Sequence, residues 1–167
     1  MMETAPPDAA YFSRLIEQHA GMVYRMCLMF LRSEADAQDA FQDVFLRVVE
    51  KRPQFNGVEH ERAWLAAVTA NRCRDLLRRG RIRRAEPIGE LELAAPGEDA
   101  QAAEVLSAVH GLQPKYRRVV VLYYYGGFST AELAAMLHCR ETTVRSQLSR
   151  ARGLLRPVLA GGADDER

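Results

Sequence analysis

The sequence predicts an all-α fold of two small helical domains joined by a flexible linker, the C-terminal domain containing a helix-turn-helix. Apolar residues recur at intervals of three and four along most of the 167 residues, which is the spacing of amphipathic helices. The pattern fails between residues 80 and 100, where five glycines and prolines occur: Gly80, Pro87, Gly89, Pro96 and Gly97. We therefore expect domains at residues 8–80 and 102–159, with the linker at 81–101.

Three helices are expected in the first domain. The first carries an apolar stripe of seven residues: Phe12, Leu15, Ile16, Val23, Met26, Cys27 and Phe30. Ser33 then precedes acidic residues in the pattern of a helix N-cap, and the second helix follows with Phe41, Val44, Phe45 and Val48 on its buried face. A loop is predicted at residues 53–59, which contain Pro53, Asn56 and Gly57. The third helix is expected to begin near Glu61, with Trp64, Leu65, Val68 and Leu76 on its apolar side.

Local preferences conflict at residues 119–125, near the middle of the second domain. These residues are β-branched or aromatic, so propensity alone favours a strand. Pro114 suits the first position of a helix, and Gly126 and Gly127 suit a helix stop twelve residues later. We predict a helix, because an isolated strand among helices would have no partner.

The helix-turn-helix is predicted at residues 128–156. Ser129 and Glu132 have capping-box spacing, and Phe128 and Leu133 stand where a hydrophobic staple would pack. Residues 138–140 are short enough for a tight turn. The helix after the turn has an apolar face formed by Val144, Leu148, Ala151 and Leu155. Its opposite face carries hydroxyls and flanking arginines, side chains that reach base edges and phosphates in the major groove: Thr142, Arg145, Ser146, Ser149 and Arg150.

Charge is unevenly distributed although the net charge is only +1. Residues 72–84 contain seven arginines and one aspartate, a net charge of +6, and residues 140–156 have a net charge of +4. Residues 34–50 have a net charge of −4. Two basic segments and one acidic segment indicate a polyanionic partner together with a second partner of different character.

Composition argues against several other classes of protein. No apolar run reaches the roughly 18 residues of a membrane span, and the N-terminus lacks the basic and apolar parts of a signal peptide, so we expect a cytoplasmic protein without membrane insertion. Cys27, Cys73 and Cys139 lack the paired spacing of a zinc site, and reduced core thiols are favoured over redox sensors. No phosphate-binding glycine loop, metal-ligand cluster or nucleophile–base arrangement is visible, so neither an enzyme nor a cofactor is expected.

Residues of both domains together resemble one family. The first domain contains, in order, Phe12, Leu15, His19, Val23, Tyr24 and Arg25, the acidic run at residues 36–46, and Phe55, Trp64, Leu65, Asn71, Asp75 and Arg78. This series is similar to conserved region 2 of extracytoplasmic-function (ECF) sigma factors of the sigma-70 family. Tyr116, Arg117 and Leu122, followed by residues 129–152, resemble their region 4. The resemblance covers about nine-tenths of the chain and implies a promoter-recognition subunit that binds core RNA polymerase.

The resemblance also implies a role for each surface. Core polymerase, through its β′ clamp and β flap, would be a partner, with the clamp contacted by Asp39, Gln42, Asp43 and Arg47. The −10 element would be bound, and a flipped base captured between Phe55 and Asn71, by the set Phe55, Asn71, Arg72, Arg74, Arg78 and Arg79. The −35 element would be read by Arg140, Thr142, Thr143, Arg145, Ser146, Ser149 and Arg150. An anti-sigma factor that holds the protein inactive is a further implied partner.

Structural interpretations compete with these roles. Trp64 at helical spacing is more typical of a core residue than of a base wedge. Phe55 could serve a pocket or packing equally well, Asn71 could cap or bridge helices, and His19 is more typical of a packed or surface histidine than of a ligand. The turn departs from the family pattern at His138 and Thr142, where glycines are common. Histidine tolerates positive φ better than most residues, so we expect the turn to form.

Two other functions remain open on sequence alone. A conventional helix-turn-helix repressor or activator would bind duplex DNA without polymerase, but it has no obvious use for the acidic helix or for the Phe55 loop. A helical adaptor without a DNA role would show no dependence of binding on salt, whereas DNA binding weakens with log salt at about −0.9 per neutralised phosphate.

Overall fold

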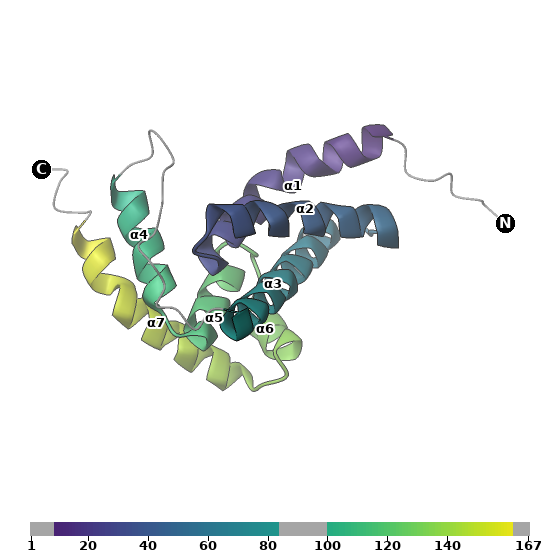
Figure 1. The fold of residues 1–167 in the computed structure, drawn as a ribbon. Helices are drawn as coiled ribbons and strands as arrows, with labels where there is room; N and C mark the ends of the chain where they lie inside the picture. Colours follow the sequence, from purple (N-terminus) through teal and green to yellow (C-terminus); the bar gives the residue numbers. More distant parts are fainter. Residues whose placement is uncertain (1–8, 84–99, 162–167) are drawn as a thin grey trace, which may run out of the picture.

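The computed structural model describes residues 9–83 and 100–161, and these fold into seven helices without a strand (Figure 1). The N-terminal half contains α1 (Ala9–Phe30), α2 (Glu34–Lys51) and α3 (Val58–Arg83). The C-terminal half contains α4 (Ala100–Gly111), α5 (Pro114–Tyr124), α6 (Thr130–Met136) and α7 (Glu141–Gly161). The predicted all-α class with two helical groups is confirmed. Of the expected linker, residues 84–99 lie outside the described residues.

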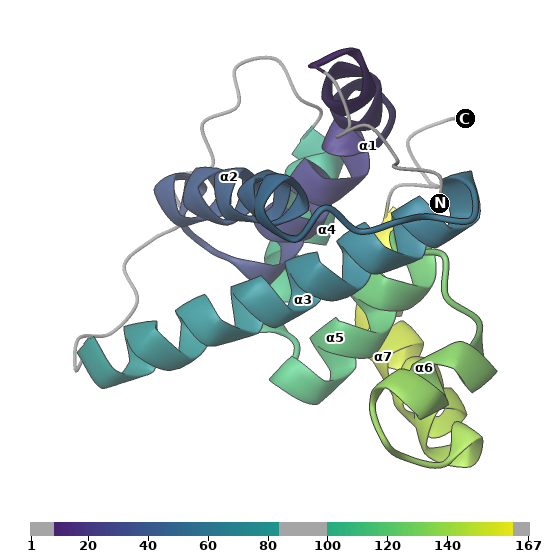
Figure 2. The same cartoon turned by 90° about the vertical axis from the view of Figure 1, so that its right-hand side faces the viewer.

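The first three helices pack on one another around an apolar core (Figure 2). Its largest fully buried side chains belong to the predicted apolar stripes: Leu15, Val23, Met26, Val44, Val48 and Leu65. The predicted N-cap is confirmed, since the Asp36 N–H donates to Ser33 Oγ at 3.3 Å. Arg52, at φ +44°, ends α2 in the left-handed conformation.

The third helix is longer than the sequence pattern predicted. It runs through Gly80 to Arg83, and nothing lies within 4 Å of a Cβ placed on Gly80. A glycine costs a helix only about 1 kcal/mol relative to alanine, and the flanking arginines are good helix formers, so one glycine does not stop the helix. The basic segment at residues 72–84 is therefore helical as far as Arg83.

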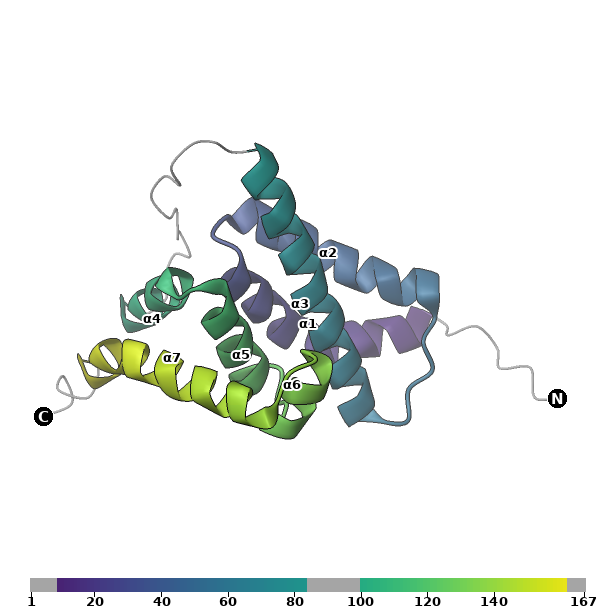
Figure 3. The same cartoon turned by 90° about the horizontal axis from the view of Figure 1, so that it is seen from below.

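The helices of the second half pack on one another (Figure 3). They bury their own set of side chains. The segment whose propensity favoured a strand is helical, with Pro114 at the first turn of α5, as predicted. Its β-branched residues Val119, Val120 and Val121 are buried among helices. Gly127, at φ +71°, lies in the connection that follows.

The two halves are in contact, because α4 and α5 pack against α1, and α5 also meets α3 (Figure 3). Backbone carbonyls at the C-terminal end of α1 accept hydrogen bonds from the second half: His110 Nε2 donates to Leu28 O at 2.7 Å, and Arg117 Nη1 donates to Phe30 O at 3.4 Å. In the opposite direction, Arg32 Nη2 donates to His110 O at 2.8 Å. The last carbonyl groups of a helix have no hydrogen-bond partner within that helix. These bonds from the second half therefore satisfy carbonyl groups that would otherwise be buried without a partner.

Arg117 and His110 are the polar centre of this contact. Arg117 is 8% exposed and also donates to the carbonyls of Val109, His110 and Leu112 at the end of α4. His110 is 2% exposed. Burial lowers the pKa of His110 below its usual value, and the positive charges of Arg117 and Arg32 act in the same direction. The neutral imidazole is the form that fits this site.

Candidate nucleic-acid interface

A capping box starts the hairpin of α6 and α7. The Glu132 N–H donates to Ser129 Oγ at 3.1 Å, and the Ser129 N–H donates to Glu132 Oε2 at 2.7 Å, so the predicted capping box is confirmed. Phe128 and Leu133 are buried, as expected of a staple. These contacts give the seven-residue helix α6 a defined start.

The turn after α6 is built around His138, which has φ +54°. The Cys139 N–H donates to Ala134 O at 3.0 Å, and the His138 N–H donates to Ala135 O at 3.4 Å. This is the Schellman arrangement, which usually places glycine at the left-handed position. The expectation that histidine supports the turn is confirmed.

Glu141 joins the two helices of the hairpin. Thr130 Oγ1 donates to Glu141 Oε1 at 2.7 Å, and Arg145 Nη2 donates to the same oxygen at 2.8 Å. The Thr130 hydrogen bond lowers the pKa of Glu141, and the charge of Arg145 adds to the effect. The start of α7 is therefore tied to the start of α6 by side chains as well as by the turn.

The outer face of α7 is open to solvent. Its apolar residues Val144, Leu148, Ala151 and Leu155 are buried, as predicted. All seven residues expected at the −35 element are exposed: Arg140, Thr142, Thr143, Arg145, Ser146, Ser149 and Arg150. One of them, Arg145, also forms an ion pair with Glu141. The hairpin thus presents a continuous polar and basic surface of the kind that enters a major groove.

A polar cavity of about 320 Å³ lies between this face and the start of α5. It is lined by Lys115, Tyr116, Thr142, Thr143, Ser146, Gln147 and Arg150. Sequence reasoning missed Lys115 and Gln147. The position of Lys115, directly after the Pro114 that begins α5, could have indicated a basic side chain at the start of that helix. Only the packing of α5 on α7 brings this side chain beside Arg150.

The acidic helix α2 exposes most of the residues expected at the polymerase. Asp39, Gln42 and Arg47 are exposed, whereas Asp43 is partly buried. Two apolar residues of the same helix, Leu46 and Val49, are 55% and 46% exposed, which sequence reasoning did not single out. Exposed apolar side chains beside charged ones are typical of a surface that docks on another protein.

The arginines expected at the −10 element are not equivalent. Arg74, Arg78, Arg79 and Asn71 are exposed on α3. Arg72 is only partly exposed, because its Nε and Nη2 both lie 2.7 Å from Asp43 Oδ2 on α2. Trp64 and Asn71 are seven residues apart, so they share a helix face and lie about 10 Å apart along its axis.

The loop between α2 and α3 is held by aromatic contacts. The Phe55 ring packs edge-on against His60 and Trp64, with centroids 5.4 and 5.6 Å apart. The structure thus pairs Phe55 with these two residues, and Trp64 is partly buried under the loop. His60 was missed by sequence reasoning, because nothing in the pattern distinguished it from a solvent-exposed residue.

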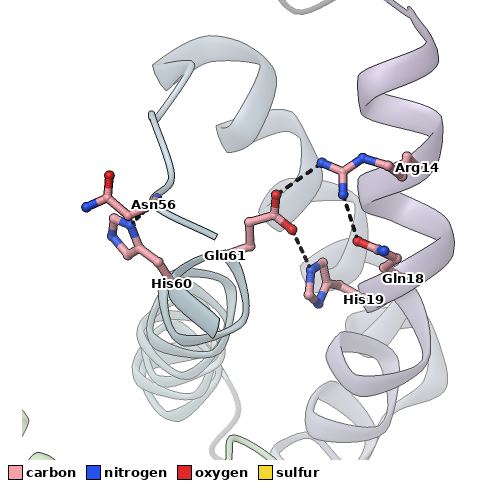
Figure 4. Close-up of polar contacts among 6 residues, drawn as sticks. All are labelled: Arg14, Gln18, His19, Asn56, His60 and Glu61. Atoms are coloured by element: carbon pink, nitrogen blue, oxygen red, sulfur yellow. Dashed lines mark hydrogen bonds and ion pairs between the residues drawn. The ribbon is translucent and has the colours of Figure 1, made fainter. Parts of the chain in front are cut away.

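Beneath this loop, a buried polar cluster joins α3 to α1 (Figure 4). Glu61 is 4% exposed; its Oε2 lies 3.0 Å from His19 Nε2, and its Oε1 lies 3.2 Å from Arg14 Nη2. His19 is therefore a packed histidine, in line with the structural interpretation. Among the described residues, no three His, Cys, Asp or Glu side chains gather to hold a metal ion.

The cysteines lie inside the protein. Cys27 on α1 and Cys73 on α3 are fully buried, Cys139 is partly buried, and all three are free thiols. A hydrogen bond with Cys27 and burial both raise the pKa of Cys73, which disfavours the reactive thiolate. None of the helices in residues 9–83 and 100–161 is long and apolar enough to cross a membrane.

Comparison with known proteins gives consistent matches. The family model for Sigma-70 region 2 matches residues 15–83, and that for Sigma-70, region 4 matches residues 102–155. The ECF RNA polymerase sigma factor SigE of Mycolicibacterium smegmatis is 34% identical over 89% of this chain, which spans 62% of that protein's length. The RNA polymerase sigma factor CnrH of Cupriavidus metallidurans is 32% identical, with 99% of this chain and 94% of that protein covered.

Solved structures show the same fold. The sigma factor RpoE in complex with the anti-sigma factor NepR from Bartonella quintana superposes with a TM-score of 0.72 at 22% identity, covering 89% of this chain and 96% of that one. CnrH in complex with the cytosolic domain of CnrY superposes with a TM-score of 0.63 at 25% identity, covering 92% of this chain and 90% of that one.

Proposed function

The chain belongs to the ECF sigma factors of the sigma-70 family, the subunits that direct promoter-specific transcription initiation, and we propose a division of that work between its two helical halves. Residues 8–80 form the domain that binds core RNA polymerase and the −10 element. Residues 102–159 form the domain that binds the −35 element, and residues 81–101 link the two. The nucleotide chemistry belongs to the polymerase, so no catalytic group is required of this chain.

The observation that carries the proposal is the solvent-exposed outer face of α7. Six hydroxyl and guanidinium side chains project from α7, Arg140 precedes them at the turn, and the opposite face of the helix is buried. In a helix-turn-helix, the second helix lies in the major groove, where arginine and small hydroxyl residues contact bases and phosphates. We assign −35 recognition to this face.

The −10 element is assigned to α3 and the loop before it. Asn71, Arg74 and Arg78 recur at three and four residues and so form one exposed stripe along α3. Phe55 offers an aromatic surface for an unstacked base, and stacking on such a surface is worth roughly 1–3 kcal/mol per base. That amount offsets the few kcal/mol that flipping costs, provided that polymerase contacts also help to open the duplex.

Core polymerase is assigned to α2. The exposed carboxylates of Asp39 and Glu50 would repel DNA phosphates, whereas the exposed Leu46 and Val49 suit a protein partner. The β′ clamp is the expected partner of this face, and the β flap is the expected partner of the second domain. Because RNA polymerase and promoters are in the cytoplasm, we place the protein there.

Promoter binding requires the two halves to separate. Arg62, in the first turns of α3, donates a hydrogen bond to the carbonyl oxygen of Gly126, which lies in the connection between α5 and α6. This contact holds the −10 loop close to the start of the helix-turn-helix. The −10 and −35 elements are about 25 base pairs, or about 85 Å, apart at 3.4 Å per base pair. The closed arrangement therefore suits the free protein or an inhibited one, and an anti-sigma factor is a further proposed partner.

Run-off transcription with core polymerase on a promoter library is the direct test. We expect specific transcripts only when the protein is added, and weak binding of the protein alone to duplex DNA. Failure to bind core polymerase would reject the proposal. A tight footprint on duplex DNA without polymerase would instead support a conventional repressor or activator, and salt-independent binding would support an adaptor.

A further inference from the structure

His110 lies at the junction between the two halves, on the helix α4 that packs against α1 (Figure 3). Its Nε2–H donates to Leu28 O at 2.7 Å, so the imidazole itself forms one of the hydrogen bonds that join the halves. The residue is only 2% exposed in this arrangement, which we call the closed form. Separating the halves would break the bond to α1 and return the covered side of the ring to water.

Two positive groups converge on the same histidine. Arg32 Nη2 donates to the backbone oxygen of His110 at 2.8 Å, and Arg117 Nη2 donates to that oxygen at 2.7 Å. Arg32 follows α1 and Arg117 belongs to α5, so the two guanidinium groups approach from different halves. A proton on the imidazole would therefore add a third positive charge to a buried junction, where like charges repel.

Opposing effects act on the protonated ring in the closed form. The hydrogen bond to Leu28 O favours protonation, because a charged donor binds a carbonyl more strongly. Burial disfavours protonation and is the larger effect, and the arginine charges add to it, so the pKa of His110 lies below its usual value. When the halves are apart, water hydrates the ring and its pKa returns toward that usual value. Opening is therefore coupled to the uptake of a proton.

We propose that His110 makes the contact between the halves sensitive to pH: protonation of its ring shifts the protein from the closed form to an open form with separated halves. Because the open form binds the proton more tightly, it gains on the closed form as the pH falls below about 6.5. The ratio of closed to open molecules changes by at most about tenfold per pH unit, which is the limit for one proton.

The consequence for transcription rests on the proposed function, in which promoter binding requires the two halves to separate. Acidification then increases the fraction of molecules in the binding-competent form. The apparent affinity for polymerase and promoter DNA rises in proportion to that fraction.

Single-molecule energy transfer between two dyes counts closed and open molecules directly. One dye is attached at Glu17 on α1 and the other at Arg156 on α7, both exposed positions. Attachment through unnatural amino acids leaves the three cysteines unchanged. The full chain is measured from about pH 7.5 to about pH 5.5, the range in which histidine titrates, at constant salt. Circular dichroism of the same samples separates opening of the halves from unfolding of the helices.

Two substitutions fix the charge at this position. His110→Gln is uncharged at every pH and keeps an N–H donor for Leu28 O. His110→Lys is charged throughout the range once its side chain is hydrated, so it favours the open form even at neutral pH. The matched control is His60→Gln, which removes an exposed histidine of α3.

We expect the closed-to-open ratio of the wild type to fall about threefold to tenfold across this range, with helical content unchanged. His60→Gln should follow the wild type, His110→Gln should vary by less than about twofold, and His110→Lys should be more open at the upper pH than the wild type is at the lower one.

A wild-type ratio that does not change with pH would overturn the inference, as would the same pH dependence in His110→Gln. Loss of helical content in step with the ratio would also overturn it, because unfolding would then explain the change. The measurement contains neither polymerase nor DNA. Failure of the proposed function is therefore distinguishable, since it appears as a lack of binding to core polymerase.

Discussion

Arg72 on α3 binds Asp43 on α2 through two nitrogens that lie 2.7 Å from the same carboxylate oxygen. The sequence had assigned Asp43 to the polymerase and Arg72 to DNA, 29 residues apart. In the folded protein each charge is neutralised by the other. This ion pair also joins the two helices whose outer faces are assigned to different partners.

A double-mutant cycle measures what this pair contributes. Asp43→Asn and Arg72→Gln should each lower the free energy of unfolding, and the coupling between them should be about 0.5–1 kcal/mol, because both side chains are partly exposed. Urea denaturation provides the measurement. Arg74→Gln, on the same helix but exposed, is the control. A coupling near zero would show that the pair does not hold α2 to α3.

The turn of the helix-turn-helix can be tested at His138, which has φ +54°. His138→Gly should leave stability unchanged or raise it by up to about 1 kcal/mol, since glycine adopts this conformation without strain. His138→Val should lower stability by about 1–2 kcal/mol, because a β-branched side chain clashes in the left-handed region. Thermal unfolding compares the two variants. Equal melting temperatures for both would contradict the geometry of the turn.

The buried His110 predicts how stability depends on pH. Its pKa is lowered in the folded state, so below the ordinary histidine value of 6.5 the unfolded chain binds more protons and stability falls as pH falls. The loss per pH unit reaches at most about 1.4 kcal/mol for one such group. His110→Gln can still donate to Leu28 O and should flatten the profile between pH 7 and 5. An unchanged slope in this variant would assign the pH dependence to other groups.

The outer face of α7 predicts how DNA binding responds to salt and sequence. Arg150→Ala should weaken binding to a promoter by the holoenzyme and reduce the salt slope by about 0.9 if the side chain contacts one phosphate. If Arg150 contacts a base instead, the loss should appear at one −35 position only. Arg156→Ala, exposed further along the helix, serves as the comparison. Equal effects of both substitutions would argue against a specific role for Arg150.

The parts of the fold that were predicted correctly depend on neighbouring residues. The capping box of Ser129 and Glu132, the apolar stripe of α7 and the start of α5 at Pro114 each lie within one to a few helical turns. The end of α3 was predicted too early, at Gly80, because a local breaker was given more weight than the arginines around it. The side chains of the candidate −35 face were identified for the same reason, since they alternate with the buried stripe.

What the sequence determined by itself was a set of amphipathic helices, their caps and the charge of each exposed face, because these follow from the helical period and from contacts a few residues long. Only the tertiary structure decided that Asp43 meets Arg72, that Arg117 and His110 bind carbonyls of α1, and that His60 accepts the Asn56 N–H beside Phe55. Such pairings depend on the crossing angles and offsets of packed helices. Many arrangements share the same periodic pattern, and side-chain packing selects among them.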